Sequence, residues 1–139
     1  MKILTVCQPH AHRIADGVKP IENRPWYTFY RGPLAIHAGL SRGWLTIGDE
    51  LAYPDMAFGA IVAVANLIHC LPINIVRRGR PPDDLAWVRT HPDATGPYCW
   101  VLSDVFRLPE PIPWRGRQGL QNVPDDLFPC LPEEFRAHV

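Results

Sequence analysis

The chain has 139 residues, of which 47% are hydrophobic and 20% are charged. This composition excludes a disordered tail, and the length predicts a single domain over residues 1–139. Fourteen basic residues balance fourteen acidic ones, so overall charge gives no reason to expect nonspecific binding to nucleic acid. Any such binding must depend on a local cluster of residues.

The cysteines and the apolar segments indicate in which cellular compartment the protein is expected. The four cysteines are far apart and form no C-x-x-C pair, and residues 1–20 lack the pattern of a signal peptide. The longest apolar stretch, residues 59–73, is interrupted by Asn66 and His69 and is too short to span a bilayer. We therefore expect a cytoplasmic protein with reduced thiols and no membrane partner.

The first half of the chain predicts short strands and short helices. Residues 1–7 are apolar and rich in β-branched side chains, which favours a strand. A short helix is expected from Pro9 to Gly17, because proline suits a first helical turn and glycine a helix end. Residues 20–30 indicate an extended edge segment, residues 34–38 a second strand, and residues 44–53 a short amphipathic helix.

The second half contains the longest predicted strands. Residues 59–70 are apolar on both faces, which predicts a central strand of a closed or well-covered sheet. Residues 72–97 are polar and predict a loop with a short helix at 84–89. Residues 98–108 predict another strand, extended by 109–114, and the remainder predicts turns and a short helix. Strands outnumber helices, so we predict an α+β fold built as a small mixed β-barrel with short flanking helices.

The segment GVKPIENRPWY, residues 17–27, gathers charges in an otherwise lysine-poor chain. In an extended segment Glu22, Arg24 and Trp26 share one face, and Lys19 can reach either side. One interpretation is a polar pocket with an aromatic wall, suited to a phosphate, a carbonyl oxygen or an amino group and to a stacked base. The other is an exposed Glu22–Arg24 surface pair. Spacing alone leaves both open.

Residues 8–41 resemble the opening of ASCH domains, RNA-associated relatives of the PUA fold. The resemblance comprises a Q-P start, a short helix, the G-x-K-x-x-E-x-R pattern that ends at Arg24, an aromatic residue, Y-R-G-P and I-H-A. Residues 59–70 and 98–120 resemble the central and closing strands of that family. The resemblance implies a PUA-like β-barrel with a cleft near Lys19, Glu22 and Arg24.

A cleft of this kind implies RNA or a nucleoside or nucleotide as the partner, with no cofactor and no metal. His37 could face the cleft or be a hydrogen-bonded histidine of the sheet. His10 and His12 point in divergent directions on the predicted helix, which indicates surface or capping groups and not a metal site. The RRGR run at 77–80 precedes PPDD and favours a solvated loop. The expected ligand-binding residues are Lys19, Glu22, Arg24, Trp26, Tyr27, Arg31, His37 and Ser41.

The resemblance also implies two hydrolase alternatives, in which Lys19, Glu22 and Arg24 would be catalytic. Some small ASCH proteins deacylate acylated cytidine with a lysine and a threonine three positions later, where this chain has Glu22. A water activated by Glu22, with Lys19 and Arg24 stabilising the oxyanion, is the form this chemistry could take here. Other ASCH proteins cleave RNA. A third alternative, a protein-binding adaptor, would need an exposed apolar patch such as residues 127–135.

Overall fold

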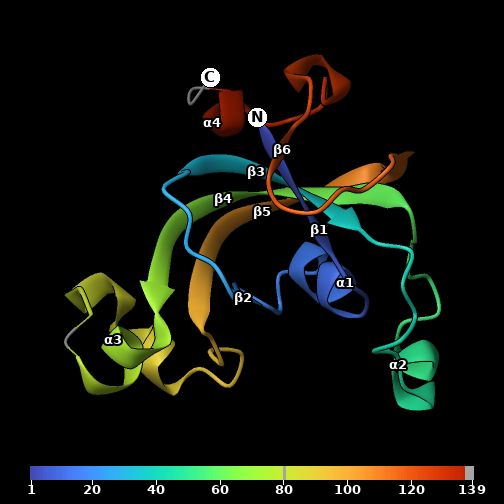
Figure 1. The fold of residues 1–139 in the computed structure, drawn as a ribbon. Helices are drawn as coiled ribbons and strands as arrows, with labels where there is room; N and C mark the ends of the chain where they lie inside the picture. Colours follow the sequence, from blue (N-terminus) through green and yellow to red (C-terminus); the bar gives the residue numbers. More distant parts are fainter. Residues whose placement is uncertain (80, 137–139) are drawn as a thin grey trace.

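The computed structural model describes residues 1–79 and 81–136, and its six strands form one mixed sheet (Figure 1). The strand order is β2-β5-β4-β3-β1-β6. Neighbouring strands are antiparallel, except that β1 and β3 are parallel. The strands are β1 (Lys2–Val6), β2 (Ile21–Arg24), β3 (Gly32–Ala38), β4 (Ala60–Pro72), β5 (Tyr98–Pro113) and β6 (Gln121–Asn122).

Short helices connect the strands, as the sequence predicted for most of them. The segment after Pro72, expected to be a loop, contains one helix that the sequence analysis missed. Its residue Val76 is buried against a small cluster of apolar side chains, which explains why the segment coils at this point. The helices are α1 (His10–Ala15), α2 (Ile47–Ala52), α3 (Ile73–Arg78), α4 (Glu133–Arg136) and the 3₁₀ helices η1 (Asp83–Thr90) and η2 (Asp125–Leu127).

The predicted α+β class is confirmed, but the sheet is not closed into the predicted barrel. Strands β2 and β6 lie at its two edges and do not pair with each other in the described ranges. The long strands β4 and β5 pair with three register shifts, and such bulges bend a sheet. The resulting arch partly encloses α1, which contacts β3, β4 and β5 (Figure 1). Helix α1 thus covers the inner face without any closing strand.

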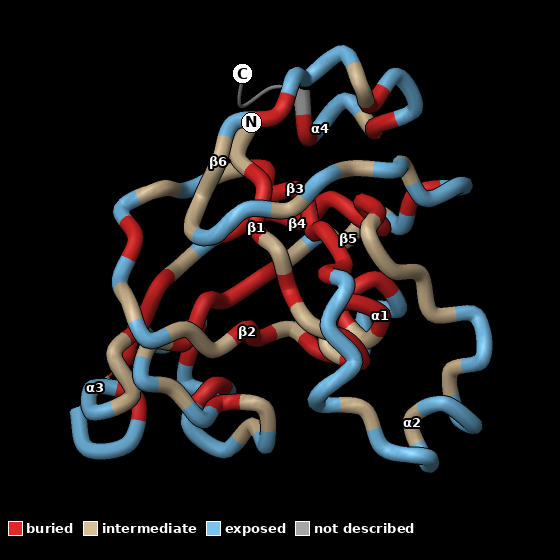
Figure 2. The backbone as a smooth tube through the Cα atoms, turned by 45° about the vertical axis from the view of Figure 1, so that its right-hand side comes forward, coloured by how far each residue is buried: buried red, intermediate tan, exposed pale blue. Residues whose placement is uncertain are grey.

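Strand alternation divides the core between the two faces of the sheet. On β3, Leu34 and Ile36 pack in the cluster that includes Ile14 of α1, whereas Ala35 packs in a cluster on the other face. Figure 2 shows the buried backbone concentrated in the strands and α1, while α2 contains no buried residue. The second cluster also buries Phe128, Leu131 and Phe135 of the C-terminal segment. The suggestion of an exposed apolar patch at residues 127–135 is therefore wrong.

Two further expectations concern cysteines and membranes. Cys7, Cys70, Cys99 and Cys130 all lie in the described part of the chain, and all four are free thiols. Within residues 1–79 and 81–136, no helix is both long and apolar enough to cross a membrane.

Candidate ligand-binding site

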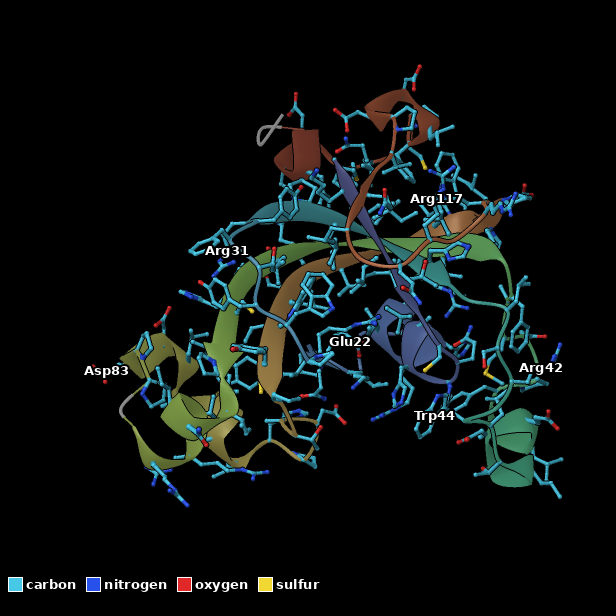
Figure 3. All side chains as sticks on the ribbon, viewed as in Figure 1. Glu22, Arg31, Arg42, Trp44, Asp83 and Arg117 are labelled. Carbon is cyan, nitrogen blue, oxygen red and sulfur yellow. The ribbon has the colours of Figure 1, made fainter. Side chains whose placement is uncertain are left out.

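A cleft of about 530 Å³ lies beside β2, near the C-terminal end of β1 and the start of α1. Strand β1 contributes Thr5, and the connection between β3 and α2 contributes Ser41 and Trp44. Figure 3 shows Glu22 between β2 and α1, and Trp44 on the segment that leads to α2. The cleft also includes Cys7, His10, Lys19, Arg24 and Thr95.

The edge position of β2 places its charged side chains at this cleft. Strand β2 pairs with β5 on one side only, with Glu22 opposite Trp100. Ile21 is completely buried in the apolar cluster under β2, so strand alternation directs Glu22 away from that cluster. The side chain of Asn23 holds the neighbouring loop by accepting hydrogen bonds from the amides of Thr95 and Gly96.

The structure brings Lys19, Glu22 and Arg24 together around one carboxylate. The Lys19 Nζ atom lies 3.8 Å from Glu22 Oε1, and the Arg24 Nε atom lies 3.2 Å from Glu22 Oε2. Arg24 also donates a hydrogen bond to the carbonyl oxygen of Thr5. Lys19 is only 3% exposed and Glu22 only 7% exposed. These residues therefore form a buried cluster and not the surface pair considered as an alternative.

Burial shifts the pKa values of Lys19 and Glu22 toward each other. Desolvation raises the pKa of Glu22, although the charges of Arg24 and Lys19 oppose the rise. Desolvation lowers the pKa of Lys19, and the Glu22 carboxylate opposes this change. Both groups therefore lose part of their preference for the charged form, a property common at functional sites.

His10 and Cys7 line the cleft, which the sequence analysis did not predict. His10 was expected at the surface or in a cap, yet its Nδ1 atom is buried and has no hydrogen-bond partner among the described residues. Burial, together with the charge of Lys19, lowers the pKa of His10. Burial and the Glu22 carboxylate raise the pKa of Cys7, which disfavours a nucleophilic thiolate. The signal in the sequence was the position of His10 at the start of the predicted helix, a few residues after the first strand.

The cleft continues into two further cavities. A cavity of about 700 Å³ shares Thr5, Arg24 and Leu40 with the cleft and is also lined by Trp26. A third cavity of about 360 Å³ adjoins the second around Trp114. Residues 114–117, after the end of β5, border both of these cavities. We call the cleft and these two cavities together the groove.

The remaining predicted site residues have different positions. His37 is 1% exposed; its Nδ1 atom lies 3.1 Å from Thr5 Oγ1 and its Nε2 atom 2.7 Å from the carbonyl oxygen of Trp114. It therefore contacts the second cavity as a hydrogen-bonded histidine of the sheet, and burial lowers its pKa although the bond to Trp114 opposes this. Trp26 packs edge-on against Trp100, with ring centroids 4.8 Å apart.

Tyr27 and Arg31 lie outside the groove as the described residues define it. The Arg31 side chain donates to the carbonyl oxygen of Thr28 and to the Tyr27 hydroxyl. The two exposed arginines of the 77–80 run that the structure describes, Arg77 and Arg78, end α3, while Arg80 is outside the described residues. Over the same described ranges, no group of three or more His, Cys, Asp or Glu side chains could hold a metal ion.

Comparison with known proteins supports the fold. No protein-family model matches the sequence, and no curated protein gives a significant match. The structure resembles the crystal structure of ASCH from Zymomonas mobilis, with a TM-score of 0.53 and 13% sequence identity over 90% of this chain and 88% of that chain. The resemblance predicted from the G-x-K-x-x-E-x-R and I-H-A motifs is thus confirmed at the level of architecture. The chain has the fold of an ASCH domain.

Proposed function

We propose that the protein recognises a nucleoside or nucleotide, free or within RNA, in the cleft beside Lys19, Glu22 and Arg24. The observation that carries this proposal is a buried carboxylate with a cation at each oxygen, on the wall of a cavity of about 530 Å³. A carboxylate accepts from an exocyclic amino group, and lysine or arginine donates to a carbonyl oxygen or ring nitrogen. Bases carry these groups side by side on their polar edges.

Energetics favour a ligand-binding role for the cluster. Desolvating a charged side chain costs several kcal/mol even when it is paired, so buried ion pairs are weak contributors to stability. Lys19 and Glu22 are both almost inaccessible, yet they face a cavity and not an apolar core. Buried charged side chains beside a cavity weaken the fold, and natural proteins accept such costs mainly at functional sites.

Aromatic side chains supply the second half of a base-binding site. Trp44 lines the cleft and is 72% exposed, so its ring is available for contact. Trp26 borders the adjoining cavity. Stacking of a base on such a ring is worth about 1–3 kcal/mol and is tolerant of base identity.

A thermal-shift and calorimetric screen with the four common nucleosides and their 5′-monophosphates tests the proposal. We expect at least one compound to raise the melting temperature of the wild type and to lose most of its affinity in Glu22→Gln and Arg24→Ala. Arg89→Ala is the matched control, since Arg89 is exposed on η1 and lines none of the cavities described above. Absence of any response, or equal affinity in Glu22→Gln, would overturn the proposal.

A small hydrolase is the second candidate, favoured by the opposing pKa shifts of Lys19 and Glu22. In this scheme Glu22 takes a proton from water, the resulting hydroxide adds to an amide carbonyl, and Lys19 and Arg24 stabilise the oxyanion. Collapse of the oxyanion breaks the C–N bond, and Glu22 returns the proton to the leaving amino group. An acylated cytidine would give cytidine and a carboxylic acid. Chromatography should then detect cytidine with the wild type and not with Glu22→Gln. Shortening of single-stranded RNA, lost in the same variant, would instead indicate a ribonuclease.

A further inference from the structure

A separate cavity of about 360 Å³ lies outside the groove, beside the start of β3 and the middle of β4 and β5. Figure 3 shows Arg31 at the left of the sheet, away from Trp44 and Arg117. The volume lies in the range of roughly 300–1,000 Å³ that holds one small ligand. None of the residues that line this cavity lines any cavity of the groove. They are Arg31, Gly32, Asn66, Leu67, Ile68 and Asp104, and we call the space between them the Asn66 cavity.

A bulge in β5 brings Asp104 to the Asn66 cavity. The register of β4 and β5 shifts between Val64 and Asn66, where two residues of β5 lie opposite one of β4. Asp104 has a φ of 51°, in the left-handed region that aspartate adopts more readily than most residues. Bulges re-aim side chains and are frequent next to functional sites. The Asp104 Oδ2 atom accepts a hydrogen bond from Ser103 Oγ at 3.1 Å, and the carboxylate is exposed.

Asn66 adds a second acceptor to the same wall. Its side chain is 8% exposed, and its Nδ2 atom lies 3.4 Å from Asp104 Oδ2. A carboxylate can only accept, so the amide end that faces Asp104 is the NH₂ group. The other end, Oδ1, is buried and has no hydrogen-bond partner among residues 1–79 and 81–136, although buried polar atoms are normally paired. Because the bond to Asp104 is long, the amide can turn and present Oδ1 to a donor in the cavity.

Arg31 supplies the opposite charge. Its Nη1 atom donates to the carbonyl oxygens of Thr28 and Tyr30, and its Nη2 atom donates to the Tyr27 hydroxyl. These bonds hold the guanidinium group beside the cavity and leave Nε and one hydrogen of Nη2 as neighbouring donors. In the part of the chain that the structure describes, neither Arg31 nor Asp104 has an oppositely charged group within 4.0 Å. Two opposite charges thus border one cavity without pairing with each other.

We propose that the Asn66 cavity binds a free apolar α-amino acid. Its ammonium group, which has three donors and no acceptor, donates to Asp104 and to Asn66 Oδ1. Its carboxylate accepts paired, charge-assisted hydrogen bonds from Arg31. Ile68 lines the cavity and is 39% exposed, so it offers an apolar surface to the side chain of the ligand. A divalent cation fits less well, because it requires more oxygen ligands than one carboxylate and one amide supply and would lie beside a guanidinium group.

Calorimetry and NMR with the full chain test this inference. The probes are glycine, valine, leucine, isoleucine and phenylalanine, together with leucine methyl ester, which lacks the carboxylate, and N-acetylleucine, which lacks the ammonium group. We expect leucine or another apolar amino acid to bind and to shift the NMR signals of the Asn66 side-chain amide. Both leucine analogues should bind at least about tenfold more weakly than leucine, the factor expected when a charge-assisted hydrogen bond is lost. Binding of no amino acid, or equal binding of either analogue, would overturn the inference.

Two variants locate the binding site. Asp104→Asn removes the charge and keeps a residue that tolerates the left-handed region, and Arg31→Gln removes the other charge. Each should weaken binding of the amino acid at least about tenfold. The matched controls are Asp84→Asn and Arg89→Gln, since both residues are exposed on η1 and line none of the cavities described. The controls should bind as the wild type does.

Full affinity in either Asp104→Asn or Arg31→Gln, or an equal loss in the controls, would overturn the inference. The nucleoside response of both variants should be that of the wild type, because neither residue lines the groove. The amino-acid site therefore stands or falls separately from the proposed function.

Discussion

The Arg24 Nε atom lies 3.2 Å from Glu22 Oε2, on the edge strand β2, which pairs with β5. The other carboxylate oxygen, Oε1, faces Lys19 at 3.8 Å. Each oxygen thus has its own cation, which fixes the plane of the carboxylate and the direction of its lone pairs. The cleft therefore presents to a ligand a hydrogen-bond acceptor, the Glu22 carboxylate, between two donors, Lys19 and Arg24, that are already in position.

The buried position of Glu22 predicts a pH dependence of stability. Burial raises its pKa above the ordinary value of 4.5, so the folded state holds the proton more tightly than the unfolded state. This stabilisation is complete below 4.5 and is lost as the pH rises through the folded-state pKa. The free energy of unfolding of the wild type, relative to Glu22→Gln, should therefore decrease from pH 4.5 upward in urea titrations. A relative stability that increases with pH would show that the pKa is depressed.

Trp44 should matter for binding and hardly at all for folding. Because its side chain is largely exposed, Trp44→Ala should change the free energy of unfolding by no more than about 0.5 kcal/mol. Loss of a stacking surface should weaken nucleotide binding by about 1–3 kcal/mol, measured by calorimetry. Trp87→Ala serves as the control, since Trp87 is on η1 and contacts His91 outside the groove. Equal affinities of the two variants would remove Trp44 from the site.

Asn23 should be important for stability because it holds the loop that borders the cleft. Its Nδ2 atom donates to the carbonyl oxygen of Asp93 at 2.7 Å, and its Oδ1 atom accepts from the amides of Thr95 and Gly96. At about 0.5–1.5 kcal/mol for each hydrogen bond, Asn23→Ala should cost roughly 2–4 kcal/mol in chemical denaturation. Asn122→Ala loses one exposed hydrogen bond, which Lys2 donates, so it should lower the free energy of unfolding far less. Similar costs would contradict this assignment.

Gly116→Ala should lower the stability of the fold. The added methyl group would collide with His37 and Thr5, and overpacking of this kind costs typically about 1–3 kcal/mol. The expected loss is measured as the free energy of unfolding in urea titrations. Gly43→Ala is the control, because its nearest neighbour, Ser41 Oγ, lies at an ordinary 3.6 Å. A neutral Gly116→Ala would show that residues 114–117 are not fixed against the sheet.

Local patterns in the sequence predicted most strands and the charged cluster. The segment LAIHA and the apolar run at 59–70 correspond to β3 and β4, since both are short or continuous apolar runs typical of strands buried on both faces. Lys19, Glu22 and Arg24 meet because they are close in the chain and lie in or beside one strand. Their spacing predicted a shared face, whereas a cleft beside them was implied by the family resemblance.

Features that depend on distant segments were not predictable in this way. Closure of the sheet would require the edge strands β2 and β6 to pair, and local alternation does not reveal whether two such distant segments meet, so the predicted barrel was not confirmed. The exposure of His10 to the cleft depends on how α1 is rotated against the sheet. Residues 114–117 border the groove because Trp114 and Gly116 contact His37, which is far away in the chain. Tyr27 was predicted as a stacking residue and Arg31 belongs to the Y-R-G-P motif, but neither lines the groove among the described residues.

A crystal structure of the protein soaked with the nucleoside monophosphate that gives the largest thermal shift is the most direct test of the central claim. We predict that the base lies in the cleft with a donor within hydrogen-bond distance of the Glu22 carboxylate and an acceptor facing Lys19 or Arg24. A cleft without ligand at saturating concentration, or a nucleotide bound elsewhere on the surface, would contradict it.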